Sequence, residues 1–413
     1  MTLFNSIFKE PTFIKSRSKE VWIGWISSFA EAYNMAIYNF MAPLLARHLF
    51  PQPTEWKAFF FSYSLVLIAA CFFYPAGAFY YGYLGDRQGR QKTCIYSTLG
   101  LSVATGMMAL VPFQFLGNNA WICILILVCA QHFFSGGEYH GSVIFSLDHA
   151  GNQQNGLVSS LSCLFAVFGL ISANGLATLA LLNDNLLLVR MSFLIGAVGG
   201  AMSYYLKNHC QETPVFISLS KDLFNKMSWL SFIRYQVRKI GIAVMVFAFF
   251  IVSYTFLFVF LPLAHWNKSS SFDTLKSLIA YGSFLVIAGL LADRASIRKV
   301  MLTGICAFSI AVLPLCSICS DLWVLQLPLT LCACLAIGPI HSWMLNQFEV
   351  QNRCRGIFVS SAIATSVFGG STVPICLIIL EKTGSLAMCA IYPFMIALGA
   401  LACLLIKPLG TCK

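Results

Sequence analysis

Two carboxylates inside long apolar stretches of the sequence are the first candidates for chemistry. Of the 15 acidic residues, Glu31 and Glu138 are the two that fall well inside such stretches. An ionised side chain near the centre of a bilayer costs about 2.5 to 3.5 kcal/mol on insertion scales, so it is retained where it has a partner or a task. We expect each carboxylate either to line a polar cavity or to hydrogen-bond a neighbouring helix or a loop arginine. For Glu138 the candidate arginines are Arg87 and Arg90.

The spacing of polar residues around each carboxylate indicates one polar stripe on each of two helices. Both stripes follow the spacing i, i+4, i+7 and i+11, which places their members on one face of a helix. The members are Ser27, Glu31, Asn34 and Tyr38 in the first helix, and Gln131, Ser135, Glu138 and Ser142 in the other. Because the other faces are apolar, we expect the two stripes to line a shared wet cavity.

Three histidines also fall well inside apolar stretches, whereas every lysine and arginine lies outside these stretches or near an end of one. They are His132, His140 and His341. An imidazole changes charge between about pH 5 and 8, so such a histidine is either a proton relay or a hydrogen-bonded contact between helices. Tyr254 and Trp343 lie in later apolar stretches, where aromatic rings either hold a quaternary ammonium group or fill space.

The composition indicates that these residues belong to a membrane protein of many spans. Hydrophobic residues make up 58% of the 413 residues and charged residues 10%, and the mean hydropathy is +0.78. A soluble domain carries roughly 25% charge. Windows of about 20 apolar residues, long enough to cross a bilayer as helices, fall at 21–45, 57–82, 93–112, 121–146, 156–180, 187–206, 240–264, 273–292, 300–318, 322–345, 356–380 and 385–406. We therefore predict an all-α membrane protein with twelve transmembrane helices.

These windows form two sets of six, separated by a polar stretch. This pattern is typical of a transporter built from two similar halves. The predicted parts are an N-terminal segment (1–20), a first half (21–206), a central loop (207–239), a second half (240–406) and a tail (407–413).

Positive charge is distributed unevenly over the two sides of the predicted helices. Of the 26 lysines and arginines, 20 lie on the side of the termini and 6 on the opposite side. This bias places both termini and the central loop in the cytoplasm. The net charge of +11 therefore follows from membrane topology, and we expect no nucleic-acid partner.

No cluster of residues in the sequence indicates an enzyme, a metal site or a cofactor. Cys316 and Cys319 form a CxxC pair, but the same predicted helix carries no histidine or acidic ligand. No set of nucleophile, base and orienting group is found either. We expect no catalytic residue, no metal and no cofactor.

A short charged motif occurs twice, at matching positions of the two halves. The loop after the second window reads GDRQGRQK (85–92), and the loop after the eighth reads ADRASIRK (292–299). Both place Asp-Arg just beyond a helix end, with a basic cluster a few residues later. The candidate gating residues are Gly85, Asp86, Arg87, Gly89, Arg90 and Lys92 in the first copy, and Asp293 and Arg294 in the second.

The first copy closely resembles the signature between the second and third helices of the major facilitator superfamily. Further segments are similar to its metabolite:proton symporter branch, which includes carriers of proline and betaine, 2-oxoglutarate, citrate and shikimate. These segments are EAYNMAIYNFMAPLLARHLFP (31–51), SGGEYHG (135–141), ETPVF (212–216), GPIHSWMLNQFEVQNRCRG (338–356) and SVFGGSTVP (366–374). The resemblance covers almost the whole chain and implies the major facilitator fold and uptake by proton symport.

The resemblance gives the first copy of the charged motif a role in gating. We expect Asp86 to lie near the N-terminus of another helix, whose dipole attracts an anion. Arg87, Arg90 and Lys92 are expected to pair with nearby acids. Rocking of the two halves must break these contacts, so they favour the closed state.

The chain departs from the pattern of the branch at several positions, three of which bear on proton coupling. Asn34 stands where an aspartate is usual, Val128 where an arginine is usual, and His132 where a glycine is usual. An acid and a base are both missing, as if a charged pair had been removed together. Proton coupling would then rest on Glu31 or on a histidine.

These observations predict a secondary transporter of a bacterial-like inner membrane that moves a small polar organic solute, a carboxylate or a zwitterion, by alternating access. The expected partners are this solute, protons and the lipid bilayer, and we expect the monomer to be functional. One alternative is a carrier, for import or export, of a siderophore or another larger carboxylate. The other is a non-transporting sensor on the same scaffold.

Overall fold

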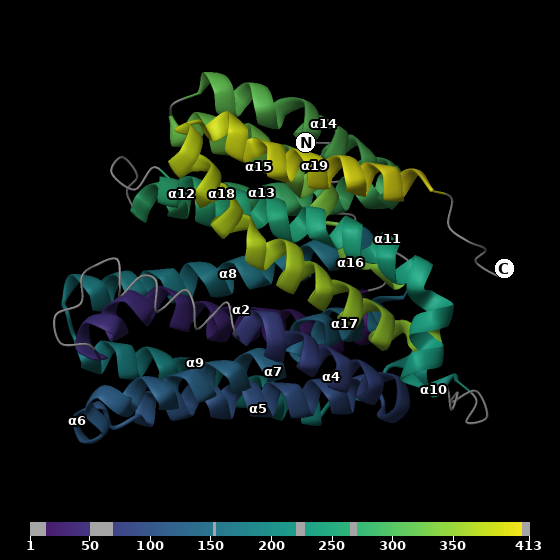
Figure 1. The fold of residues 1–413 in the computed structure, drawn as a ribbon. Helices are drawn as coiled ribbons and strands as arrows, with labels where there is room; N and C mark the ends of the chain where they lie inside the picture. Colours follow the sequence, from purple (N-terminus) through teal and green to yellow (C-terminus); the bar gives the residue numbers. More distant parts are fainter. Residues whose placement is uncertain are drawn as a thin grey trace, which may run out of the picture.

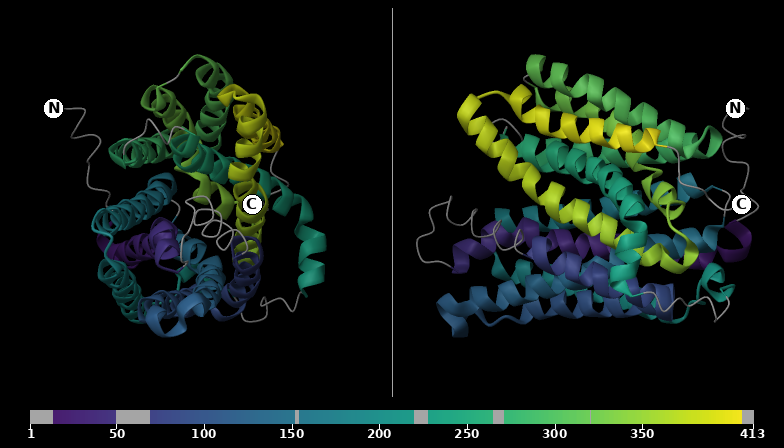
Figure 2. Two further views of the ribbon diagram at one scale, coloured as in Figure 1. Left: turned by 60° about the vertical axis from the view of Figure 1, so that its left-hand side comes forward. Right: turned by 45° about the vertical axis from the view of Figure 1, so that its right-hand side comes forward.

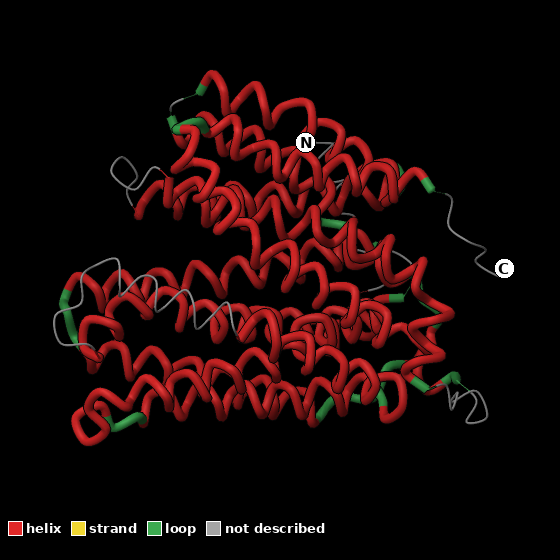
Figure 3. The backbone as a smooth tube through the Cα atoms, in the orientation of Figure 1, coloured by secondary structure: helices red, strands yellow, loops and turns green. Residues whose placement is uncertain are grey.

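The chain is helical throughout the residues that the computed structural model describes, which are 14–49, 69–151, 154–219, 228–264, 271–319 and 321–406. Figure 3 shows helices joined by short loops, with no strand in these ranges. The apolar windows of the sequence therefore form helices, as a bilayer requires of spanning segments, because every backbone polar group must be bonded internally.

The first half of the bundle comprises the helices from α2 to α9, which ends at residue 208. It consists of α2 (Ile14–Leu49), the π-helical turn η1 (Ala69–Phe73), α4 (Tyr74–Gln88), α5 (Arg90–Leu110), α6 (Phe113–Leu116), the 3-10 turn η2 (Gly117–Asn119), α7 (Ala120–Ala150), α8 (Asn155–Leu182) and α9 (Leu186–Asn208). Figure 1 shows these helices as the lower layer of the molecule.

The second half begins with α11, after the short helix α10 (Pro214–Ile217). It consists of α11 (Trp229–Thr255), the π-helical turn η4 (Phe256–Phe260), α12 (Leu261–Ala264), α13 (Ser271–Arg294), α14 (Ile297–Ile318), α15 (Leu322–Ile337), α16 (Ile340–Leu345), the 3-10 turn η5 (Val350–Asn352), α17 (Arg353–Ile363), the π-helical turn η6 (Ala364–Gly369), α18 (Gly370–Thr383) and α19 (Leu386–Leu405). These helices form the upper layer in Figure 1.

Ten helical segments among the described residues are long and apolar enough to cross a membrane. Two further predicted windows, 21–45 and 57–82, fall on α2 and on η1 with α4, and the second of these windows starts outside the described residues. The prediction of an all-α protein of many spans is confirmed. The number twelve stays a prediction.

The two halves converge at one end of the bundle and diverge at the other (Figure 1). The contacts between them include those of α4 with α17 and of α8 with α13. We call the convergent end, where α4 and α13 finish and α8 and α17 begin, the gate end. The first residues of α2 and the last residues of α19 also lie toward this end (Figure 2).

Three spans of the bundle contain a π-helical turn, and two of these turns meet between the halves. η1 contacts η6, and the Cys71 thiol lies 3.7 Å from the carbonyl oxygen of Ser366. The third turn, η4, directly precedes the short helix that holds Pro262, a residue without an N–H to continue the helical ladder. π-Helical turns inside α-helices are frequently found at functional sites.

Candidate functional site

Glu31 is a buried carboxylate of α2 with an exposed fraction of 8%. Ser135 of α7 donates a hydrogen bond to its Oε1 atom. Within the described part of the chain, this hydroxyl is its one hydrogen-bond partner, and no lysine or arginine forms an ion pair with it. Among the described residues, Glu31 is therefore a buried carboxyl group without an ion-pair partner.

The other members of the α2 stripe make contacts inside the first half. Ser27 Oγ lies 2.6 Å from Ser203 Oγ of α9. Asn34 faces α9 so closely that a Cβ atom added to Gly196 would lie 2.3 Å from Asn34 Oδ1. Tyr38 is buried in an apolar cluster of the same half. A role of Asn34 and Tyr38 in a substrate cavity stays a prediction.

The α7 stripe faces the α2 stripe, as their shared spacing indicates. Besides the bond from Ser135 to Glu31, the side-chain amide of Gln131 donates to the backbone oxygen of Asn34 at 3.3 Å. The same amide donates to Thr105 Oγ1 of α5 at 2.7 Å. The two polar stripes therefore meet between α2 and α7.

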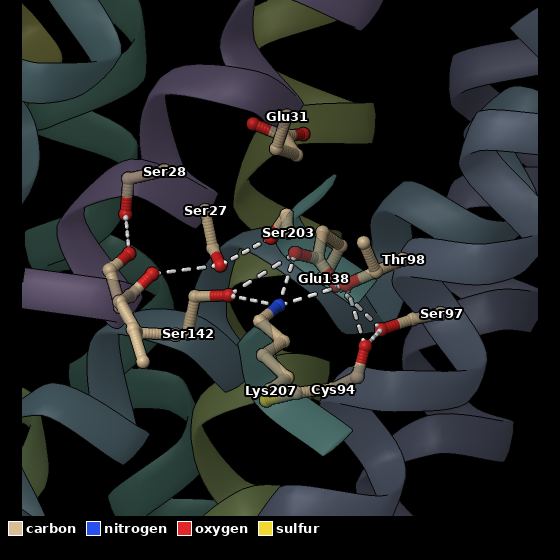
Figure 4. Close-up of polar contacts among 12 residues, drawn as sticks. Ser27, Ser28, Glu31, Cys94, Ser97, Thr98, Glu138, Ser142, Ser203 and Lys207 are labelled. Carbon is tan, nitrogen blue, oxygen red and sulfur yellow. Dashed lines mark hydrogen bonds and ion pairs between the residues drawn. The ribbon is translucent and has the colours of Figure 1, made fainter. Parts of the chain in front are cut away.

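Glu138 forms a buried ion pair with Lys207 of α9. The Lys207 Nζ atom lies 2.5 Å from Glu138 Oε1, and both side chains are 1% exposed. Hydroxyl groups surround the pair, and Figure 4 shows the ammonium group directed into this cluster while Glu31 stands apart. The hydroxyl donors to Glu138 are Ser97 at 2.8 Å, Thr98, and Ser142 at 3.2 Å.

The expectation that Arg87 or Arg90 pairs with Glu138 is wrong, and Lys207 was missed. The predicted helix ended at residue 206, so Lys207 was assigned to the central loop, whereas α9 extends to Asn208. One signal in the sequence identifies it: Lys207 follows Ser203 by four residues and so shares its helix face.

His132 is held within its own helix. Its Nδ1 atom lies 3.0 Å from the carbonyl oxygen of Val128, one turn earlier. This geometry is that of a hydrogen-bonded helix residue, so His132 remains a proton relay only as a prediction.

His341 lies in a cluster that both halves form. Its Nε2 atom lies 3.2 Å from Tyr139 Oη of α7, and its ring centroid lies 5.6 Å from that of His140. Phe247 and Phe250 of α11 pack against it, with ring centroids at 6.1 and 6.3 Å. The second histidine of the sequence prediction, His140, is thereby brought together with the third.

Tyr254 and Trp343 pack among apolar side chains of the second half. The Tyr254 ring centroid lies 5.3 Å from that of Phe258 and 6.1 Å from that of Tyr281. Trp343 is buried in α16. Both contacts are those of space-filling aromatic residues, and a role in holding a solute stays a prediction.

Asp86 binds the N-terminus of α17 across the junction between the halves. Its two carboxylate oxygens accept hydrogen bonds from the backbone N–H of Cys354 at 2.9 Å and of Arg355 at 3.1 Å. The Arg355 Nε atom donates to the same carboxylate at 3.0 Å. The expectation that Asp86 lies at the N-terminus of another helix is confirmed, and the helix dipole stabilises its charge there.

Asp293 makes the matching contact from the second half. Its two oxygens accept hydrogen bonds from the backbone N–H groups of Gly156 at 2.7 Å and Leu157 at 2.8 Å, at the start of α8. Each half therefore caps a helix of the other, and both caps lie at the gate end.

An acidic residue at the end of α7 completes this network. Asp148 accepts a hydrogen bond from Arg353 Nη1 at 2.8 Å, and Arg90 Nε lies 3.5 Å from its Oδ2 atom. Arg90 Nη2 also donates to the carbonyl oxygen of Val350 at 2.8 Å. Arg90 thus holds both an acid of its own half and the backbone of the other.

The glycines of the charged motif allow close approach. A Cβ atom added to Gly85 would lie 3.0 Å from Cys354 Sγ of α17. Gly89 has a φ of 110°, which L side chains rarely adopt, and it separates α4 from α5.

The remaining basic residues of the motif lie outside the junction. Arg87 stacks on the ring of Tyr83, with its guanidinium carbon 4.5 Å from the ring centroid. Lys92 and Arg294 are exposed. Arg90 is therefore the motif arginine of the first copy that enters the gate network.

Two helical layers that cap one another at one end and diverge at the other are the plan of a membrane transporter built from two similar halves. The chain belongs to the major facilitator superfamily, whose family model matches residues 24–282. It is thus a transporter and not an enzyme.

Three curated relatives agree with the branch that the sequence motifs indicate. The ectoine/proline transporter ProP of Corynebacterium glutamicum is 23% identical over 89% of this chain and 79% of its own length. The inner membrane metabolite transport protein YhjE of Escherichia coli is 26% identical over 89% of this chain and 88% of its own. The proline/betaine transporter of Escherichia coli is 27% identical over 48% of this chain and 41% of its own.

Two solved structures show the same fold. A double-tryptophan mutant of XylE superimposes with a TM-score of 0.74 at 14% identity, covering 92% of this chain and 94% of that one. FucP, in the outward conformation, superimposes with a TM-score of 0.70 at 15% identity, covering 94% and 99%.

Proposed function

We propose that this chain is a secondary active transporter that takes up a small zwitterionic solute together with protons across a bacterial inner membrane. Twelve transmembrane helices in two halves, 21–206 and 240–406, work by alternating access, with the central segment 207–239, both termini and the gate end in the cytoplasm. The monomer is the functional unit.

The single observation that carries the substrate class is the burial of the Glu31 carboxyl group without an ion pair among the described residues. A buried carboxylate is retained where a partner offsets its cost, and the solute supplies this partner as a cationic group. Glu138, by contrast, is already neutralised by Lys207. The relatives whose printed names include proline, betaine or ectoine support a solute with such a group.

The contacts at the gate end support alternating access. The caps formed by Asp86 and Asp293 join the halves at one end only, and opening that end requires that they break. A mechanism with two alternative openings follows from this arrangement.

Uptake into proteoliposomes tests the proposed function. With radiolabelled glycine betaine and L-proline as probes, an acidic outer solution should accelerate uptake and drive accumulation of at least one probe. A variant with Asp86→Asn serves as the control for the gate. If a siderophore or a citrate-type carboxylate is accumulated instead, the alternative carrier function is correct, and solute binding without translocation indicates a sensor.

Replacement of Glu31 tests the role of its charge. For Glu31→Gln we expect the KM for glycine betaine to rise at least about tenfold, because the cationic group loses an ionic partner in a site of low dielectric. The dependence of uptake on outer pH should remain. Initial uptake rates at several solute concentrations and at pH 6 and 8 measure both properties.

Glu31→Asp is the matched variant, since it keeps the charge and shortens the side chain by one methylene. Its KM should lie between those of the wild type and Glu31→Gln. An unchanged KM together with a lost pH dependence would show that Glu31 carries the proton and does not hold the solute.

A further inference from the structure

Two histidines from different halves lie side by side in the buried junction. His140 belongs to α7 and His341 to α16, and their ring centroids are 5.6 Å apart. Their exposed fractions are 2% and 3%. Rings from α11 and α17 enclose His140, with Phe247 at 5.3 Å and Phe358 at 6.3 Å between centroids. The pair is therefore a point where titratable groups of both halves meet in apolar surroundings.

Among the described residues, the ring of His140 presents a buried nitrogen without a hydrogen-bond partner. This nitrogen is Nδ1, whereas His341 Nε2 lies 3.2 Å from Tyr139 Oη. A nitrogen without a partner can carry the lone pair of the neutral imidazole and can accept a proton once water reaches the charge. A second proton on the neighbouring ring would be repelled, so the pair holds one proton at a time.

We propose that His140 and His341 form the proton-binding site of the transporter, an inference that rests on the proton coupling of the proposed function. The proton binds at His140 Nδ1, and while the gate end is open it passes to water on the side where the proton activity is lower. No covalent bond of the protein changes, and the net transfer is one proton from one side to the other.

Proton binding can drive the conformational change only if the proton interacts differently with the closed and the open state, because a ligand shifts an equilibrium only in that case. In the state described here, the pair is buried against rings of two other helices, α11 and α17, where a charged imidazole loses its hydration. Separation of α7 from α16 and α11 lets water reach the charge. Protonation therefore favours opening at the gate end, and loss of the proton favours the state with the caps formed.

Glu31 is also a titratable group in a span, but its described contacts do not differ between the closed and the open state in this way. Its hydrogen-bond partner Ser135 belongs to the same half. A proton on Glu31 changes no described hydrogen bond between the halves, whereas a proton on His140 alters a contact that must break in each cycle.

The groups that face the pair leave its charge largely unopposed. Tyr139 of α7 lies beside both the Cys163 thiol of α8, at 3.7 Å, and His341. Tyr139 also interacts electrostatically with Tyr281 of α13 and with Glu31 of α2. Glu31 is the single carboxylate among these groups, and the side chains from α11 and α17 are phenylalanines. The proton on the pair is thus the charge that changes during the cycle.

Proton influx in proteoliposomes tests the proposal. With an internal pH-sensitive dye, addition of glycine betaine to the wild type should acidify the vesicles. In the double variant with His140→Gln and His341→Gln, the ratio of proton-driven accumulation to solute exchange should fall at least about tenfold, because exchange needs no net proton movement. His209→Gln is the matched control, since the His209 ring is exposed and bonds its own helix, and it should leave the ratio unchanged.

Hydrogen–deuterium exchange in detergent provides a measurement that needs no solute. Residues 154–160 and 350–357, where α8 and α17 begin, should exchange faster at pH 6 than at pH 8 after correction for the intrinsic rate. This difference should vanish in the double variant and in each single variant that folds. A double variant that keeps both proton influx and the pH-dependent exchange overturns the proposal. Wild type that shows this exchange but takes up neither probe would contradict the proposed substrate alone.

Discussion

Replacing Lys207 with methionine should destabilise the folded protein by about 3 to 5 kcal/mol, because removing one partner of a buried ion pair leaves the other charge unpaired. Lys207 Nζ lies 2.5 Å from Glu138 Oε1, and both side chains are 1% exposed. The hydroxyl groups of Thr98 and Ser142, at 2.7 and 3.0 Å from Nζ, carry no charge that would replace it. Thermal denaturation of the purified protein in detergent measures the loss as a lower Tm.

The double variant with Glu138→Gln and Lys207→Met separates the cost of an unpaired charge from the value of the pair. A glutamine keeps acceptors and donors for the surrounding hydroxyl groups, so the double variant should recover more than half of the lost stability. Lys92→Met removes an exposed lysine and is the control for the loss of a positive charge alone. A Lys207→Met protein as stable as the wild type would contradict the structural role of the pair.

The helical fold and the gate motif could be predicted because each leaves a local signal. Apolar windows of about 20 residues indicate spans, since a bilayer accepts a backbone only when it is internally hydrogen-bonded. The position of Asp86 followed from the attraction between a carboxylate and a helix N-terminus, and the structure confirms it with two backbone hydrogen bonds. The repeated motif also indicated that Asp293 occupies an equivalent position.

The partners of these residues could not be predicted, because they lie far away in the sequence. Asp86 and Arg355 are separated by 269 positions, and no periodicity of a single helix relates them. Asp148 likewise bonds Arg353 of the other half. Such contacts depend on how the two helical layers dock, which is a property of the whole bundle.

The polar stripes show the limit of periodicity on one helix. The spacing placed Glu31, Asn34 and Tyr38 on one face, but a stripe that is about a third of a turn wide touches more than one neighbour. Glu31 bonds α7, Asn34 faces α9, and Tyr38 lies among apolar side chains. Packing by several helices divides a stripe that the sequence presents as continuous.

Replacing Asp86 with asparagine should lower the rate of transport at least about tenfold, because Asp86 loses charge-assisted hydrogen bonds that are each worth about 1.5 to 3 kcal/mol. Asp86 is 4% exposed, so water does not compensate for the lost charge. Arg355 keeps its bond to Asn352 Oδ1 at 2.6 Å but loses its carboxylate partner. Initial uptake of radiolabelled glycine betaine, corrected for the amount of protein in the vesicles, measures the effect.

The equivalent substitution Asp293→Asn tests what decides the size of this effect. Asp86 is buried and bonds Arg355 in addition to capping a helix, whereas the described contacts of Asp293 are those of a helix cap alone. Asp293 is exposed and accepts hydrogen bonds from the backbone of Gly156 and Leu157. The interaction of an exposed charge with a helix dipole is worth about 0.3 to 1 kcal/mol, which is less than the loss expected at Asp86. The rate should fall by about two- to fivefold. Equal losses for the two variants would show that the helix cap dominates at both positions. The expected inequality would instead mean that the cap with the buried arginine holds the gate end closed, and that the second cap adjusts the balance.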